Sequence, residues 1–303
     1  LASAPFADIP GGGSGGGENY LEKPSEYELE RMAPRTDLEM LSANLAGENI
    51  SLADGGLSFS ATDVSIPLNM AVSAAISRSY NRLSGQNDKE ASEFGDWSLD
   101  LPRIESTYVD GDIRLTPNFY STRACTEALA PGPIRVSLGN VAEQHEYWNG
   151  ATLTIPGQGG GKLLNKSPYG QSGYYGTTDN MAIDCGEDGS GNEYFIVKTP
   201  NGLTYTLKQR RTIRGMPLVR KNKAATRKKL LYLATEVQDR FGNKLNYQYQ
   251  GNGLLQYIKH TPKNGAQETL VTLAYSSNRV TSVTSFGKTW RYEYVGKNLS
   301  KVI

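Results

Sequence analysis

The residues that could carry hydrolytic chemistry are few and widely spaced. His145 and His260 are the only histidines, and neither belongs to a helical metal motif such as HExxH or lies near a nucleophile in the sequence. We expect both to have packing or surface roles. The segment Gly170-Gln171-Ser172-Gly173 superficially resembles the sequence motif around an activated serine. Glycine and tyrosine surround it, however, and no strand leads from it into a helix. A loop is the better interpretation.

Oxygen-bearing side chains give two weaker candidates. One is a set with alternating spacing beside glycines, which could wrap a calcium ion if the loop curls inward: Asp184, Asp188, Ser190 and Asn192. This spacing departs from the EF-hand pattern, so an ordinary turn is preferred. The other is a glycosidase-like carboxylate pair, for which a chance set of surface acids is the better explanation: Asp110, Asp112, Glu143 and Glu146. The sequence thus predicts no enzyme, no metal site and no cofactor.

The two cysteines, Cys125 and Cys185, are sixty positions apart and lie outside any CxxC pair. They are also far from the histidines, so a zinc site is not expected. In an oxidising compartment they could form one disulfide, which would close a long loop and stabilise the fold by roughly 4 kcal/mol. Two buried free thiols are an equally good interpretation.

Composition limits the classes of function. The chain has 303 residues, 38% of them apolar, and a formal net charge of +1, so no global field recruits nucleic acid or an anionic membrane. One local basic run, from Lys208 to Lys229, contains ten Lys or Arg residues and no acid. A solvated hairpin explains this run better than a site for nucleic acid or an anionic glycan, and we expect no nucleic-acid partner.

The N-terminal part predicts export and an irregular arm. Ala2-Ser3-Ala4 has the small-x-small pattern of a signal-peptidase site, so we expect a secreted or cell-surface protein whose signal peptide is already removed. No run of eighteen apolar residues occurs, so no membrane span is predicted. Residues 11–17 read GGGSGGG, and the acidic stretch that follows is interrupted by Pro24 and Pro34. Residues 1–46 are therefore predicted to form a flexible arm.

From residue 50 the apolar residues alternate with period two, as in strands. A hairpin is expected at Ile50 to Ala61, with Asp54-Gly55-Gly56 as its turn. Short runs of the same kind recur, each bounded by turn residues, at 72–80, 97–104, 146–155, 194–199 and 203–208. The sequence predicts an all-β fold of successive antiparallel hairpins in a curved sheet, with an N-terminal β domain over residues 47–235.

A repeated pattern occupies the rest of the chain. Two segments forty-five positions apart match in register: Phe241-Gly242-x-x-Leu245-x-Tyr247-x-Tyr249 and Phe286-Gly287-x-x-Trp290-x-Tyr292-x-Tyr294. A weaker middle copy supplies Leu273-x-Tyr275. Alternate tyrosines share one face of a strand, and stacked units of this kind bury a continuous core. These residues are the predicted structural core of three repeats over residues 236–303.

The sequence DRFGNKLNYQYQGNGLLQYIKH at 239–260 resembles the YD repeat of bacterial RHS proteins and of the related teneurin-type and toxin-complex shells. Upstream, the segments at 54–82, 94–105 and 197–207 resemble the strands that precede such repeats. The pattern also departs from the family, because the later copies lack the Asp-x-x-Gly-Asn opening and Tyr-Asp is replaced at Tyr249-Gln250, Tyr275-Ser276 and Tyr294-Val295.

The resemblance implies a strand ribbon that spirals into a shell, often around a C-terminal toxin or effector. The leading hypothesis is therefore a non-catalytic shell or scaffold segment whose partners are further YD-repeat polypeptide and a cargo outside this chain. The alternative is a cell-surface carbohydrate-binding adhesin, in which exposed tyrosines and Trp97, Trp148 or Trp290 stack on glycans.

Overall fold

The computed structural model describes residues 48–50, 57–82, 92–110, 123–126, 134–137, 140–142, 150–165, 174–214, 218–220 and 223–303. The chain consists of two compact units, Leu1–Ala43 and Asn44–Ile303, and every described strand belongs to the second unit. The arm predicted over residues 1–46 lies outside the described residues. The described part consists of strands and turns, which confirms the all-β prediction, and it holds no helix that could cross a membrane.

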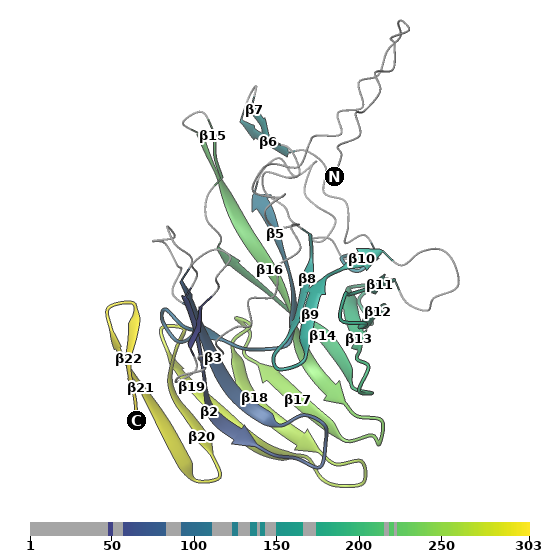
Figure 1. The fold of residues 1–303 in the computed structure, drawn as a ribbon, viewed down its shortest axis with the longest axis vertical. Helices are drawn as coiled ribbons and strands as arrows, with labels where there is room; N and C mark the ends of the chain where they lie inside the picture. The colour runs from purple at the N-terminus through teal and green to yellow at the C-terminus, as the bar shows by residue number, and fades with distance from the viewer. Residues whose placement is uncertain are drawn as a thin grey trace, which may run out of the picture. The chain divides into compact units, whose positions relative to one another are not determined.

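A small antiparallel sheet forms first along the chain (Figure 1). Its strand order is β1-β2-β3-β4, with bounds β1 Glu48–Ile50, β2 Leu57–Ile66, β3 Ala74–Arg82 and β4 Ser98–Leu99. Ile50 lies opposite Leu57, so the strands of the predicted first hairpin do pair. The turn expected at Asp54-Gly55-Gly56 lies outside the described residues.

A sixteen-stranded sheet contains most of the remaining chain. Its central path runs from β10 to β22, with β5, β8, β9 and β15 attached to the side. The bounds are β5 Arg103–Asp110, β8 Thr152–Ile155, β9 Gly159–Lys162, β10 Leu164–Asn165, β11 Tyr175–Gly176, β12 Ala182–Glu187, β13 Glu193–Lys198, β14 Thr204–Arg214, β15 Leu218–Arg220, β16 Lys223–Gln238, β17 Lys244–Tyr249, β18 Leu255–Thr261, β19 Glu268–Ser276, β20 Arg279–Ser285, β21 Lys288–Val295 and β22 Asn298–Val302. A separate pair joins β6 Ile134–Ser137 to β7 Asn140–Ala142.

The long strand β16 is where the large sheet forks. One edge of β16 pairs with β14, whereas the other edge pairs with β5 and then with β17. The change of partner occurs near Ala234, whose N–H donates to the carbonyl of Pro102 at 3.0 Å. The boundary expected between residues 235 and 236 falls inside this strand, and the sheet is continuous across it.

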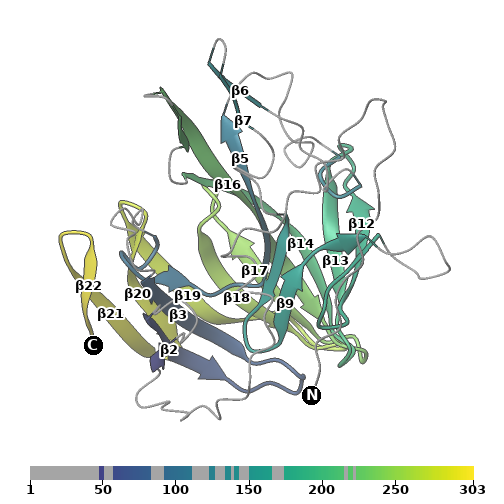
Figure 2. The same cartoon turned by 45° about the horizontal axis from the view of Figure 1, so that its top comes forward.

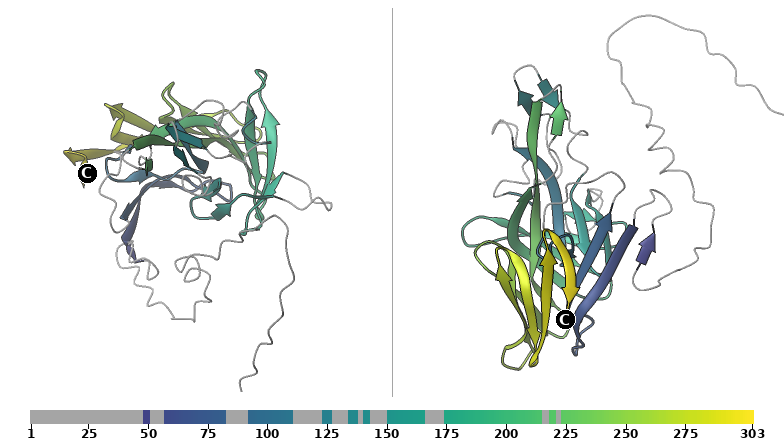
Figure 3. Two further views of the ribbon diagram at one scale, coloured as in Figure 1. Left: turned by 90° about the horizontal axis from the view of Figure 1, so that it is seen from above. Right: turned by 90° about the vertical axis from the view of Figure 1, so that its left-hand side faces the viewer.

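The face of the large sheet that carries Tyr205 and Tyr292 is its inner face, and other strands of the chain cover it. Figures 2 and 3 show the β2–β3 pair and the β8–β9 hairpin on the concave side of the curved sheet. Both contacts involve hydrogen bonds: Gln158 Nε2 donates to the hydroxyl of Tyr205 at 3.0 Å, and the hydroxyl of Tyr292 donates to Asp63 at 2.9 Å.

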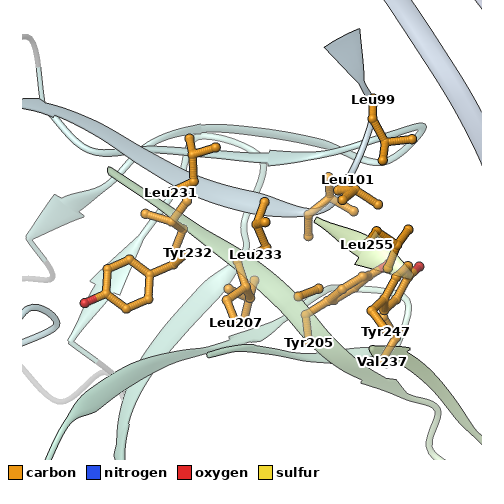
Figure 4. Close-up of a cluster of buried hydrophobic side chains, with 14 of the residues drawn as sticks. Leu99, Leu101, Tyr205, Leu207, Leu231, Tyr232, Leu233, Val237, Tyr247 and Leu255 are labelled. Carbon is orange, nitrogen blue, oxygen red and sulfur yellow. The ribbon is translucent and has the colours of Figure 1, made fainter. Parts of the chain in front are cut away.

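The space between these layers is a hydrophobic core. Apolar side chains alternate along β18, β19 and β20, so each strand turns one row inward. Figure 4 shows the part of the core near the fork, where side chains from four regions of the sequence meet: Leu99, Leu101, Tyr205, Leu207, Leu231, Tyr232, Leu233, Val237, Tyr247 and Leu255.

Candidate functional site

Three tyrosines link successive hairpins through the same hydrogen bond. Tyr249, Tyr275 and Tyr294, here called the tyrosine spine, lie on β17, β19 and β21. Each hydroxyl donates to a backbone carbonyl of the preceding strand. The acceptors and distances are Ala234 at 2.6 Å, Leu255 at 2.6 Å and Val280 at 2.7 Å.

A β-bulge accompanies every member of the spine. The register shifts between Gln248 and Tyr249, between Ala274 and Tyr275, and between Glu293 and Tyr294. A bulge disrupts the ladder locally and increases the twist of the strand. Leu255 pairs with Tyr249 and accepts from Tyr275, while Val280 pairs with Tyr275 and accepts from Tyr294. Each hairpin therefore supplies the acceptor for the tyrosine of the next.

The predicted repeat residues do not all share one environment. Tyr247, Leu273 and Tyr292 are buried at the equivalent inner position, two residues before each spine tyrosine. Leu245 is buried as well, and Trp290 packs against the core. Phe241 and Phe286 differ, because they precede Gly242 and Gly287 in the turns, where φ is +92° and +76°, and remain 62% and 69% exposed.

An Asp-x-x-Gly-Asn turn occurs twice, at Asp188–Asn192 and Asp239–Asn243. The carboxylate of Asp239 accepts from the N–H groups of Phe241 and Asn243 at 2.8 and 2.9 Å and from Asn243 Nδ2 at 2.8 Å. Asp188 makes the same backbone contacts with Ser190 and Asn192, both at 2.9 Å. The recurrence of this motif fifty-one positions apart is a signal in the sequence that our repeat assignment missed.

Electrostatics at these turns fit a closed hydrogen-bonded loop. Hydrogen bonds from the backbone N–H groups of Asn192 and Ser190 lower the pKa of Asp188. For Asp239, burial acts to raise the pKa, but the hydrogen bonds from Asn243, Phe241 and Gly242 outweigh it and the pKa is lowered. The carboxylate of Asp188 is thus engaged by the N–H groups of its own turn, and the described residues contain no cluster of three or more His, Cys, Asp or Glu side chains that could hold a metal.

A buried ion pair between two strands of the small sheet, Asp63 on β2 and Arg78 on β3, accepts a hydrogen bond from the repeats. Arg78 Nε lies 2.9 Å from Asp63 Oδ2, the same oxygen that accepts from the hydroxyl of Tyr292. The Arg78 guanidinium also lies 4.5 Å from the centre of the Trp97 ring, and the rings of Phe94 and Tyr292 are 4.8 Å apart. Burial, followed by the charge of Asp63, raises the pKa of Tyr292 far above its usual value. We call Asp63, Arg78, Phe94 and Tyr292 the latch.

Residues 92–97 extend this contact to three further strands, β14, β20 and β22. Glu93 forms an ion pair with Arg211 of β14, and its carbonyl accepts from the N–H of Val280 at 2.8 Å. The carboxylate of Asp96 accepts from the N–H of Leu299, on β22, at 2.7 Å. The small sheet is therefore bonded to strands that are separated from it by more than a hundred residues of sequence.

A disulfide fixes a third long connection. Cys125 and Cys185 are joined, with Cα atoms 5.6 Å apart. The carboxylate of Glu193 accepts from the N–H groups of Cys125 and Thr126 at 2.9 and 2.8 Å, and the hydroxyl of Tyr175 donates to the Cys125 carbonyl at 2.6 Å. These bonds tie residues 123–126, within the long connection from β5 to β8, to strands β11, β12 and β13.

Among the candidates that the structure describes, His260 and Trp97 form no reactive site. His260 is buried, with Nδ1 3.4 Å from Glu268 Oε1. Trp97 packs against the core and has a guanidinium over its ring, so it is not free to stack on a glycan. Several other predicted residues lie outside the described part of the chain: Asp112, Glu143, His145, Glu146, Trp148 and the segment 170–173.

Comparison with known proteins adds distant likenesses only. No protein-family model and no curated protein matches the sequence. Among solved structures, the N-terminal domain of effector protein SpvB from Salmonella typhimurium strain LT2 is similar at 12% identity and a TM-score of 0.28, over 71% of this chain and 72% of that chain. Two structures of TcdB2-TccC3, one named with TEV and one without the hypervariable C-terminal region, each align at 11% identity and a TM-score of 0.22. They cover 82% of this chain and 16% of theirs. At these values the likenesses carry no argument about this chain.

The spine gives a first expectation for stability. Replacing Tyr275 by Phe removes one hydroxyl and leaves the buried carbonyl of Leu255 without its partner, which should lower the free energy of unfolding by about 1–2 kcal/mol. Tyr257→Phe is the matched control, because this half-buried tyrosine on β18 makes no hydroxyl hydrogen bond to the described residues. Equal urea midpoints for the two variants would show that the spine bond adds nothing.

Buried tyrosines predict a loss of stability in alkali. Burial raises the pKa of Tyr205, Tyr232 and Tyr294 to about 12, whereas the pKa of an unfolded tyrosine is about 10. The raised pKa means that the stabilisation is complete below pH 10 and is lost as the pH rises from about 10 to 12. Urea unfolding at increasing pH should show this decline, with tyrosinate absorbance appearing as the fold is lost. Full ionisation near pH 10 in a protein that stays folded would contradict it.

Proposed function

We propose that this chain is a non-catalytic structural segment of a secreted RHS/YD-repeat protein, which helps to enclose or present a C-terminal toxin or effector outside this chain. The observation that carries the proposal is the tyrosine spine, in which equivalent hydroxyls join three successive hairpins to the strands before them. Each unit needs its neighbour to complete its hydrogen bonds, as expected of a stacked repeat.

The position of the small sheet supports a role at the end of a shell. Repeat arrays need atypical terminal units that cover the apolar face of the first repeats. In this chain the small sheet contacts the inner face of the large sheet at β21, through the latch, and the β8–β9 hairpin contacts it at β14, through Gln158. In our proposal these strands therefore close one end of the shell.

The proposed partners follow from the last edge of the sheet, where, among the described residues, Asp96 occupies only the N–H of Leu299. β22 is paired with β21 on one side and is terminal in the strand order, so a further repeat strand could add beside it. We propose YD-repeat polypeptide, either continuous with this chain or a separate fragment, as that neighbour, and no nucleic acid. The disulfide between Cys125 and Cys185 supports an oxidising, extracellular setting.

Containment can be tested on the native protein isolated from its source without reductant. Protease is added across a urea titration, while the unfolding of the β scaffold is followed by tryptophan fluorescence. We expect a cargo polypeptide that becomes cleavable only at the urea concentration where the scaffold unfolds. Cargo that is cleaved while the scaffold is folded, or the absence of any second polypeptide or continuation, would overturn the proposal.

A further inference from the structure

One end of the large sheet gathers aromatic and cationic turn residues. In an antiparallel meander alternate turns lie at the same end, so the turns that join β16 to β17, β18 to β19 and β20 to β21 share one end, the lower end in Figure 1. We call five exposed aromatic and cationic residues at these turns the rim: Arg240, Phe241, Lys263, Phe286 and Lys288. One exposed acid, Glu268, lies at the same end, next to His260. The outer turns are four strand spacings apart, about 19 Å.

The two phenylalanines of the rim contribute little to the core. Phe241 and Phe286 are 62% and 69% exposed, at equivalent positions in their repeats. Phe286 also has a φ of +45°, a region that large side chains rarely occupy. A glycine or asparagine would suit this turn better, so the packing and the backbone give no reason for an aromatic residue there. Such an outlier points to a use at the surface.

Charge on the rim is positive and unpaired. Arg240, Lys263 and Lys288 form no ion pair with any residue in the described ranges. The Arg240 guanidinium lies 5.2 Å from the centre of the Phe241 ring. The neighbouring carboxylate of Asp239 is already occupied by the hydrogen bonds of its own turn.

We propose that the rim docks on an anionic lipid bilayer, with Phe241 and Phe286 inserted between headgroups and the three cations next to lipid phosphates. Aromatic side chains flanked by Lys or Arg suit this interface because the ring enters the acyl boundary while the charge stays at the headgroups. A cavity of about 280 Å³ beside Phe241, lined also by Met70 and Leu203, could hold a small ligand. Phe286 does not line that cavity, so a small ligand there would not explain both rings. This proposal is independent of the proposed shell.

The test is flotation of the full chain with phosphatidylcholine vesicles, with and without phosphatidylserine. We expect binding that requires phosphatidylserine and weakens as salt is added. Phe241→Ser and Phe286→Ser should each weaken binding roughly tenfold, and Lys263→Glu about fivefold or more. Phe286→Trp should keep the wild-type affinity, which separates insertion of a ring from a local change in the turn.

Val295→Ser is the matched control, because Val295 is 72% exposed at the opposite end of β21. This variant should bind as the wild type does, and urea midpoints of all variants check that the fold is intact. Binding that ignores phosphatidylserine, or folded Phe→Ser variants that bind like the wild type, would overturn the proposal. If every phenylalanine variant binds soluble heparin as well as it binds vesicles, the rim is a general polyanion site instead.

Discussion

Replacing both Cys125 and Cys185 by alanine should lower the free energy of unfolding by about 4 kcal/mol. The disulfide spans a sequence separation of 60 residues, so its removal lets the unfolded chain expand. For the same reason the dependence of the free energy on urea should become steeper. The measurement is urea unfolding of the oxidised wild type and of the double variant.

Two controls separate the covalent bond from side-chain packing. Reduced wild-type protein keeps both sulfur atoms and should unfold near the midpoint of the double variant. Cys185→Ala alone should behave like the double variant, because Cys125 then has no partner. A midpoint for the double variant equal to that of the oxidised protein would show that the bond does not stabilise this fold.

The second large loss of stability should follow from removing one partner of the ion pair in the latch. Asp63→Ala leaves Arg78, whose side chain is only 12% exposed, without its counter-ion, and it removes the acceptor of Tyr292. Removal of one partner from a buried ion pair costs about 3–5 kcal/mol. Trp97 lies against Arg78, so its fluorescence should report the release of the small sheet at lower urea.

A double variant distinguishes lost attraction from an uncompensated charge. Asp63→Leu combined with Arg78→Leu removes both charges and should be less destabilising than Asp63→Ala alone. Asp184→Ala is the surface control, since its partner Lys198 is 57% exposed and such pairs contribute at most about 1 kcal/mol. An Asp63→Ala protein as stable as Asp184→Ala would contradict the latch.

The local periodicity of the sequence was enough to predict the strands, but it did not predict the tertiary contacts between them. Alternation predicted the first hairpin, and the spacing of Tyr249 and Tyr294 predicted the repeated hairpins, because period two belongs to a single strand. The bond from Tyr292 to Asp63 crosses 229 positions of sequence, and no local pattern encodes a contact of that separation. The prediction that Phe241 and Phe286 belong to the core was wrong, because a turn position faces solvent even where its residue recurs with the core tyrosines.

The turns and the cysteines mark the limit of what the sequence predicts. Asp188 and Asp239 head the same motif, so a search for that motif would have extended the repeat upstream of residue 236. The connection between Cys125 and Cys185 could not be derived in that way. It depends on residues 123–126 folding onto Glu193, and only the tertiary structure distinguishes a disulfide from two buried thiols.

The most direct test of the shell account is a photo-cross-link from the edge of the sheet in the native source. A photoreactive residue replaces the exposed Lys301 on β22, and the exposed Thr212 on β14 serves as the control position. Intact-mass and cross-link analysis should find YD-repeat polypeptide next to position 301, continuous with the chain or bound to it, and none at position 212. A free chain with no cross-link from position 301 would contradict the account.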